Sequence, residues 1–275
     1  MTAQEGRPEK KEIYFHVGLG KTGTTFLQYR AFPHFEGFEY IQRTRFHKAK
    51  DIVREGTAQR YFISFECDRQ LEEVVKDWAR DFPDTIPIIC FRRQDSWIAS
   101  QYRRFVKNCH VRSFPELFDI KNDQGIFKKE HLLFRPMIDL LENHFSHPPI
   151  VVFHDDLKKD AKAFISNLAK RMGSKVDVGK LDLSSKHSSY SPRQLRFLMR
   201  VSHYIDLQKR VIFKNKVLEF FRKSMVNGTR YLILFIGRFW PDNGKGPLMT
   251  SETKEEIRQL FEDDWALVSA YTSAR

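Results

Sequence analysis

A lysine and three threonines lie among glycines near the start of the chain, in the segment Gly18-Leu-Gly-Lys-Thr-Gly-Thr-Thr25. An apolar run, Ile13–Val17, precedes the segment, and a helical pattern follows it directly. Glycines let the backbone turn sharply and approach a ligand, and the N–H groups at a helix N-terminus favour an anion. The segment therefore predicts a phosphate-binding loop, with these candidate residues: Gly20, Lys21, Thr22, Gly23, Thr24 and Thr25.

The loop departs from the pattern of nucleoside triphosphate-binding proteins. A Walker A motif, G-x-x-x-x-G-K-[ST], requires a glycine five residues before Gly20, where this chain has Phe15 within an apolar run. The third apolar run also ends in Arg92 rather than in a magnesium-binding aspartate. A small-molecule kinase of the P-loop type is therefore the weaker alternative.

The segment Lys21-Thr-Gly-Thr-Thr25, followed by Phe26-Leu-Gln28, is similar to the 5′-phosphosulfate-binding loop of the sulfotransferases. These enzymes use 3′-phosphoadenosine-5′-phosphosulfate as the sulfuryl donor. The family binds the 3′-phosphate with an Arg at the end of a buried strand and a Ser eight residues later. Arg92, after the apolar run Ile86–Phe91, and Ser100 have this spacing. An arginine offers a planar fork to phosphate oxygens, and a serine offers a short hydroxyl donor.

The resemblance extends further along the chain. Val151–Leu157 resembles the family's strand and acidic segment, and Lys186–Pro192 resembles the loop that leads into its C-terminal helices. Lys245 and Gly246 correspond to a loop that some members fold over the 3′-phosphate. The chain resembles bacterial and carbohydrate-modifying members more than the cytosolic phenol-modifying ones, whose C-terminal glycine-rich loop is not found. The resemblance implies a P-loop NTPase-like three-layer α/β fold, a nucleotide sulfate donor and no required metal.

Sulfuryl transfer requires neutralisation of the leaving phosphate and a base for the acceptor. Lys21 is the candidate donor to the leaving oxygen, and the resemblance implies that Ser100 tempers this lysine until the substrate binds. Glu66, after the apolar run Tyr61–Phe65, is the leading candidate for the base, and His16 is the second. Two structural roles for Glu66 stay open: capping a helix that begins near position 68, or pairing with the nearby Arg69.

Short apolar runs alternate with helical patterns along the chain, which is typical of a parallel sheet covered by helices on both faces. We predict one α/β domain over residues 1–275, with a flexible tail at 1–11 and additional C-terminal helices at Ser191–Lys223 and Ser251–Ser269. The strands are expected at Ile13–Val17, Tyr61–Phe65, Ile86–Phe91 and Pro149–Phe153. The helices after them are expected at Thr24–Phe32, Asp68–Phe82, Asp95–Lys107 and Asp155–Met172.

The composition narrows the class of protein. The 275 residues are 41% hydrophobic and 30% charged, which excludes a disordered chain. The net charge of +12 attracts phosphate, sulfate, nucleic acid or an acidic membrane surface. Three cysteines without a motif favour neither a disulfide framework nor a zinc site.

The sequence also predicts the cellular location of the protein and the class of its partners. No signal peptide is recognised, and the apolar run Tyr231–Gly237 is too short to span a bilayer, so we expect a soluble cytoplasmic protein. The expected acceptor is a glycan, a lipid or a small molecule, and a peripheral membrane contact stays open. Nucleic acid is not expected as a partner, although a basic nucleic acid-binding module is the third alternative. The sequence does not indicate the oligomeric state.

Overall fold

The computed structural model describes residues 11–111, 113–183, 190–208, 213–241 and 246–273. These residues gather into two compact units. Unit 1 comprises Met1–Arg93, Leu133–Ser184 and Asp263–Arg275, and unit 2 comprises Gln94–Leu132 and Ser185–Glu262. Most of the predicted N-terminal tail, residues 1–10, lies outside the described residues. One domain over the whole chain stays a prediction.

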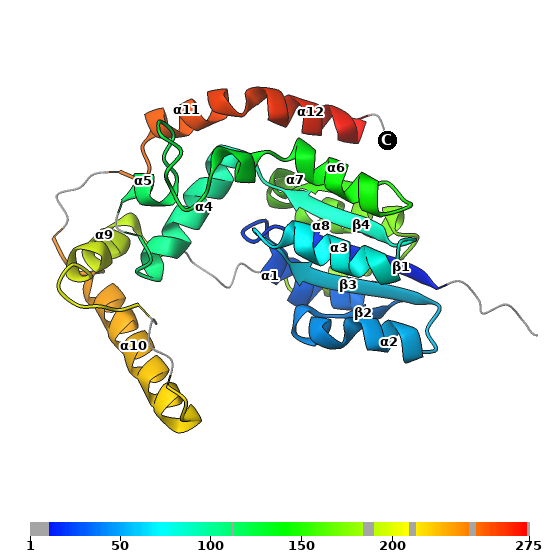
Figure 1. Ribbon diagram of the computed structural model, residues 1–275, viewed down its shortest axis with the longest axis horizontal. Coiled ribbons are helices and arrows are strands. Elements are labelled where there is room, and N and C mark those ends of the chain that lie inside the picture. Colours follow the sequence, from blue (N-terminus) through cyan, green and yellow to red (C-terminus); the bar gives the residue numbers. More distant parts are fainter. Residues whose placement is uncertain (1–10, 112, 184–189, 209–212, 242–245, 274–275) are drawn as a thin grey trace, which may run out of the picture. The chain divides into compact units, whose positions relative to one another are not determined.

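Unit 1 is built on a five-stranded sheet in the order β2-β3-β1-β4-β5 (Figure 1). All neighbouring strands are parallel. The four predicted strands are confirmed with ends that differ by at most one residue, and a short edge strand, β2, is additional. The strands are β1 Glu12–Gly18, β2 Glu39–Ile41, β3 Arg60–Glu66, β4 Ile86–Phe91 and β5 Ile150–Phe153.

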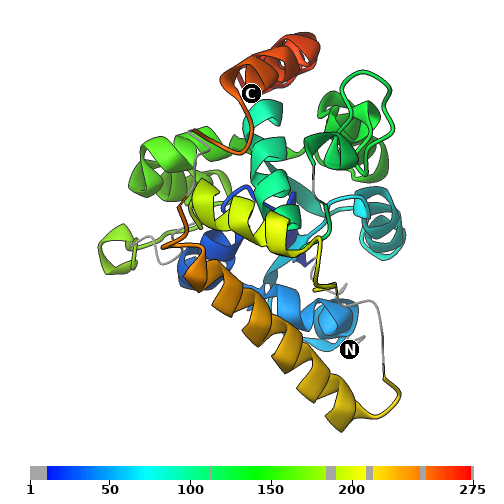
Figure 2. The same cartoon turned by 90° about the vertical axis from the view of Figure 1, so that its left-hand side faces the viewer.

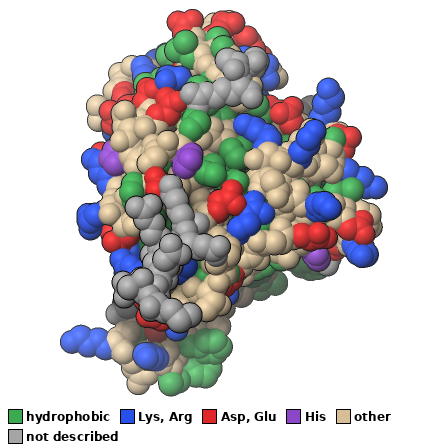
Figure 3. All heavy atoms as spheres, turned by 90° about the vertical axis from the view of Figure 1, so that its right-hand side faces the viewer, with side chains coloured by type: hydrophobic (Ala, Val, Ile, Leu, Met, Phe, Trp, Pro, Cys, Tyr) green, Lys and Arg blue, Asp and Glu red, His purple; other side chains and the backbone are tan. Residues whose placement is uncertain are grey.

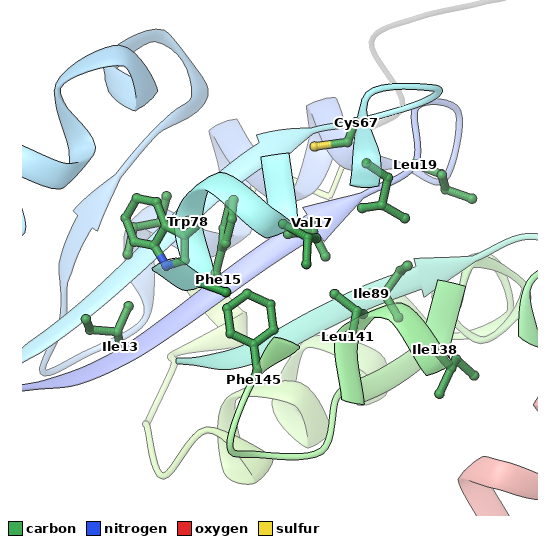
Figure 4. Close-up of a cluster of buried hydrophobic side chains, with 14 of the residues drawn as sticks. Ile13, Phe15, Val17, Leu19, Cys67, Trp78, Ile89, Ile138, Leu141 and Phe145 are labelled. Carbon is green, nitrogen blue, oxygen red and sulfur yellow. The ribbon is translucent and has the colours of Figure 1, made fainter. Parts of the chain in front are cut away.

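Alternation of side chains along β1 divides the core of unit 1 into two layers. Ile13, Phe15 and Val17 face one cluster, whereas Tyr14 faces the other. The first cluster includes residues of α2 (Ala49–Glu55), α3 (Leu71–Asp81), α6 (Arg135–His144) and α12 (Glu262–Ser273). Figure 4 shows Phe15 and Val17 with Trp78 of α3 and Leu141 of α6. The second includes residues of α7 (His154–Lys159), α8 (Ala161–Arg171) and the helical segment after β1.

Two predicted long helices are interrupted. The pattern over Asp155–Met172 forms α7 and α8, because Asp160 has an extended backbone and its carboxylate accepts the Ala163 N–H at 3.0 Å, which caps the second helix. The pattern over Ser191–Lys223 forms α9 (Pro192–Val201) and the beginning of α10 (Lys216–Ile236). The Asn215 side chain caps α10 and thereby sets its start.

The C-terminal pattern likewise forms two helices, α11 (Ser251–Leu260) and α12. Thr250 caps α11, since its hydroxyl accepts the Thr253 N–H at 3.2 Å. No helix among the described ranges is both long enough and apolar enough to cross a membrane.

Unit 2 contains α4 (Gln94–Lys107), α5 (Phe114–Leu117), α9, α10 and α11. Helices α9 and α10 meet near the C-terminal end of α10, as Figure 2 shows. There the rings of Phe197 and Trp240 lie 4.8 Å apart, and the Gln194 amide donates to the Leu234 carbonyl at 2.9 Å. The side chain of Arg258 on α11 pairs with the buried Asp95 on α4 at 3.0 Å.

Candidate functional site

The loop after β1 turns tightly before the first helix, with two residues in the left-handed backbone region. β1 ends at Gly18, and helix α1, Thr24–Phe26, continues into a π-helical turn at Leu27–Ala31. Gly23, the residue before α1, has φ +84°, and Lys21 has φ +72°. Because a left-handed backbone is costly for a residue with a Cβ, the surrounding structure must hold Lys21 in place.

Side chains from two neighbouring strand ends hold this loop. The Gly20 N–H donates to the carboxylate of Asp68 at 2.9 Å, just beyond the end of β3. The Arg92 guanidinium, just beyond the end of β4, donates to the Lys21 carbonyl at 3.1 Å. Because β1 lies between β3 and β4, all three groups meet at the carboxyl edge of the sheet, where open α/β sheets bind ligands.

The three threonines of the loop have different roles. The buried Thr22 hydroxyl donates to the Leu19 carbonyl at 2.7 Å, and the Thr24 hydroxyl donates to the carboxylate of Glu66. Thr25 is exposed. Two hydroxyls therefore stabilise the loop itself, which leaves the N–H groups of the first helical turn as the natural anion donors.

Gly23 marks the closest approach between the loop and the start of α7. A Cβ at this position would lie 2.7 Å from Leu157 Cδ2 and 3.6 Å from His154 Cδ2. Both the positive φ and this contact require a glycine.

His154 is a site residue that we did not predict from the sequence. It follows β5 directly, as Arg92 follows β4, and the register pairs Phe91 with Phe153. Burial, followed by the positive charge of Arg92, lowers the pKa of His154 to about 4. Its buried Nδ1 has no hydrogen-bond partner among the described residues. The ends of adjacent strands were the signal that could have identified it.

Glu66 ends β3 opposite Gly18 of β1. One carboxylate oxygen accepts the Thr24 hydroxyl, and the other pairs with Arg43 at 3.2 Å. The side chain is 19% exposed. Helix α3 begins at Leu71, after the end of β3, so Glu66 is not the residue that caps it. The carboxylate therefore contacts the glycine-rich loop through Thr24, pairs with the exposed Arg43 and is partly accessible to solvent.

His16 lies inside the sheet rather than at its edge. It is 1% exposed, and its Nδ1 is 2.8 Å from the Ser64 hydroxyl, which also accepts from Gln28 at 2.9 Å. Burial lowers the pKa of His16 to about 3. A Cβ at Gly18 would lie 2.6 Å from His16 Nε2, so the imidazole ring packs directly against the start of the loop. This position favours packing over catalysis.

The cysteines near the site are inert. Burial raises the pKa of Cys67 and of Cys90 to about 12, so both thiols stay protonated at neutral pH. Within the part of the chain that the structure describes, no group of three or more His, Cys, Asp or Glu side chains is arranged to hold a metal ion.

The remaining predicted site residues lie in unit 2 or outside the described ranges. Ser100 lies within α4, in unit 2, whereas Arg92 belongs to unit 1. Gly246, with φ +103°, belongs to unit 2, and its carbonyl accepts from Arg196 at 3.1 Å. Lys245 lies outside the described residues. The structure thus brings together the loop, Glu66 and Arg92, and a shared site with Ser100, Lys245 and Gly246 stays a prediction.

Chemically, the unit 1 site offers helix N–H groups and two cationic side chains, Lys21 and Arg92, at one sheet edge. A neutral imidazole, His154, and a carboxylate, Glu66, flank them. Such a set can bind a ligand with more than one phosphate and can accept a proton from a neighbouring group.

Comparison with protein-family models finds no match, and comparison with curated proteins finds none. Among solved structures, a sulfotransferase from Alicyclobacillus acidocaldarius superposes with a TM-score of 0.51 at 14% identity. The match covers 65% of this chain and 87% of that chain. A retinol dehydratase, solved in complex with androsterone and the inactive cofactor PAP, matches with a TM-score of 0.35 at 11% identity. That match covers 94% of this chain and 81% of that chain.

The match to the sulfotransferase from Alicyclobacillus acidocaldarius establishes the fold. The central parallel sheet with helices on both faces is shared with a sulfotransferase, so the predicted fold class and the resemblance on which it rested are confirmed.

Proposed function

We propose that the protein is a sulfotransferase that transfers a sulfuryl group from 3′-phosphoadenosine-5′-phosphosulfate to a hydroxyl or amine of an acceptor. One observation carries the proposal: the Arg92 guanidinium reaches the backbone of Lys21 at 3.1 Å, so two cations share one glycine-rich loop. A donor with phosphates at both the 5′ and 3′ positions needs such a pair of cationic groups. The acceptor class, whether glycan, lipid or small molecule, is left open.

The residues present fit this donor. Gly23 lets the loop pack closely against Leu157, and Arg92 and Lys21 supply cationic groups at the same loop. The loop N–H groups and Lys21 would hold the 5′-phosphosulfate, and Arg92 would hold the 3′-phosphate, with Ser100 and the segment Lys245–Gly246 proposed to complete the site. When bound, the donor supplies an activated sulfuryl group.

The chain's own residues then have distinct tasks. Lys21 neutralises negative charge on the leaving phosphate oxygen, and such charge stabilisation acts mainly in the transition state. Glu66 takes a proton from the acceptor, for which it is exposed enough and close enough to the loop through Thr24. Thr24 orients the carboxylate by bonding one oxygen, and the exposed Arg43 pairs with the other.

The kinase alternative is disfavoured by the position of Phe15. This side chain is fully buried and lies 5.0 Å from Trp78 and 5.6 Å from Phe46, measured between ring centroids. A residue in the middle of β1 and in the core cannot be the first glycine of a phosphate loop.

The experiment that tests the proposal is a transfer assay with sulfur-labelled donor against a panel of glycans, lipids, phenols and amines. We expect labelled product from at least one class, and Lys21→Ala should abolish turnover while only moderately weakening binding of adenosine 3′,5′-bisphosphate. Equal turnover by Lys21→Ala and the parent would contradict the assignment of the loop.

A further inference from the structure

Helix α10 presents large apolar side chains to solvent. Val217, Phe221, Met225, Leu232 and Phe235 are each between 58% and 67% exposed, and we call these five residues the α10 apolar stripe. Their spacing of three, four or seven residues places them on one side of a helix. Soluble proteins seldom expose so many large apolar groups on one element without a partner.

The opposite side of α10 is the one that packs. Glu219, Arg230, Ile233 and Leu234 are its buried residues. The usual surface helix buries its apolar side and exposes its polar side. On α10 the buried residues are two polar ones, Glu219 and Arg230, and two apolar ones near its C-terminal end, Ile233 and Leu234, so packing within unit 2 does not account for the apolar stripe.

The charges around the stripe are positive. Glu219 is the only acidic residue between positions 216 and 236, and it is buried and bonded to Arg222 at 3.2 Å and to Lys223 at 3.0 Å. The exposed charged residues at the two ends of the helix are lysines and an arginine: Lys214, Lys216 and Arg238. An apolar stripe with basic ends is complementary to an anionic lipid surface.

We propose that the α10 apolar stripe binds the surface of a bilayer that contains anionic lipids. The 21-residue helix is roughly 31 Å long, and its buried residues all lie on the side away from the stripe, so α10 lies in the plane of the interface with its stripe among the lipid chains. A second copy of the chain fits the stripe less well, because it would bring the same basic ends together. This inference does not depend on the proposed transferase activity.

The test is flotation of the full chain with vesicles, without nucleotide. Vesicles of phosphatidylcholine with an equal part of phosphatidylglycerol should bind the protein roughly a hundredfold more strongly than phosphatidylcholine alone, because each surface-facing basic residue contributes about 1 kcal/mol. The double variant Phe221→Glu with Met225→Glu should bind the anionic vesicles at least tenfold more weakly.

A matched control carries the same change of charge elsewhere. Leu260 and Leu267 are exposed apolar residues on α11 and α12, so Leu260→Glu with Leu267→Glu should bind as the parent does. The three native thiols are buried, so a dye attached to Met225→Cys reports the stripe itself and should shift to the blue with anionic vesicles. This second readout applies even if the double glutamate variant fails to fold.

Three outcomes would overturn the inference. They are no binding to anionic vesicles, equal loss of binding in the control variant, and a dimer in sedimentation analysis that the stripe variant abolishes while vesicles bind nothing. Because the assay contains no nucleotide, a failure here leaves the transferase proposal untouched, and a failure of the transfer assay leaves this inference untouched.

Discussion

Arg92 is the residue on which the proposed donor site depends most. Its guanidinium lies at the end of β4 and donates to the carbonyl of Lys21. Burial and, after it, the charge of Arg92 lower the pKa of the neighbouring His154, so Arg92 acts on the segments that follow both β1 and β5, the two strands beside β4. A cation in this position is expected to distinguish donors by their 3′ group.

We predict that Arg92→Ala weakens binding of adenosine 3′,5′-bisphosphate by about 2–5 kcal/mol, because a charge-assisted bond to phosphate is lost. Binding of adenosine 5′-phosphosulfate, which has no 3′-phosphate, should change little. Calorimetric titration of both nucleotides checks this. An equal loss for both would mean that Arg92 supports the loop through Lys21 rather than binding the 3′-phosphate.

The variant Glu66→Gln distinguishes a catalytic role of Glu66 from a structural one. Glutamine keeps an oxygen that can accept the Thr24 hydroxyl, but it cannot take a proton. We predict a loss of roughly two to four decades in turnover with donor affinity nearly unchanged. Arg43→Ala, which removes the ion pair and leaves the carboxylate, is the control and should stay within a few-fold of the parent. Parent-like turnover of Glu66→Gln would assign this residue a supporting role.

For individual residues, the sequence predicted which ones lie at strand ends better than it predicted their hydrogen-bond partners. Strand ends could be located from apolar runs, so Arg92 and Glu66 were identifiable. The threonines were predicted as residues of the phosphate-binding loop, but the hydroxyl of Thr22 donates to Leu19 and that of Thr24 donates to Glu66. The bond of Thr24 joins residues 42 positions apart, so no local pattern reveals it, and that of Thr22 depends on the exact turn of the loop.

The loop and the first helix form the element that must be rigid. Gly23 combines a φ of +84° with contact to α7. We predict that Gly23→Ala lowers the free energy of unfolding by at least 1–2 kcal/mol, roughly the cost of a left-handed backbone for alanine, and weakens nucleotide binding further. Thermal unfolding with and without adenosine 3′,5′-bisphosphate measures both effects.

Gly228 provides the control for this substitution. It lies within α10, and a Cβ there would meet nothing within 4 Å. Gly228→Ala should therefore leave the protein as stable or more stable by about 0.5–1 kcal/mol. If both alanine variants behave alike, the backbone of the loop is not the constraint described.

Element boundaries were less predictable than element types. Apolar runs of five or six residues marked four strands, but β2 has three residues and is too short to show a pattern. The break at Asp160 was missed, because helical periodicity continues across it and only its capping bond to Ala163 divides α7 from α8. The apolar stripe of α10 became visible only once its buried side was known.

At the scale of the whole molecule, the net charge of +12 is the difference between 47 basic and 35 acidic residues. On the face drawn in Figure 3, Lys and Arg side chains are interspersed with Asp and Glu side chains. An anionic partner is therefore expected to bind where basic residues have few acidic neighbours, as at the ends of α10, rather than wherever the net charge of +12 is spread. Composition alone could predict an anionic partner but not its place on the surface.

Global stability should depend on pH through His16. This histidine stays neutral in the folded protein down to a pKa of about 3, whereas an unfolded histidine takes up a proton near pH 6.5. Between these values the unfolded state binds more protons, so the free energy of unfolding falls as the pH decreases. We predict that His16 contributes about 2 kcal/mol of this loss at pH 5.

Urea unfolding at pH 7.5 and pH 5 measures this effect. In His16→Gln the difference between the two pH values should be smaller by that amount. The same difference in parent and variant would show that other groups cause the pH dependence. The comparison uses each protein against itself, so a general loss of stability in the variant does not affect it.

The most direct test of the donor site is a calorimetric titration of the parent protein with adenosine 3′,5′-bisphosphate, without metal. Adenosine 5′-monophosphate and ATP with magnesium serve as the comparison ligands. We predict binding of the bisphosphate at least a hundredfold tighter than of either, because both Lys21 and Arg92 would contact it. Tighter binding of ATP with magnesium, together with no measurable binding of the bisphosphate, would contradict the assignment of this loop to a sulfuryl donor.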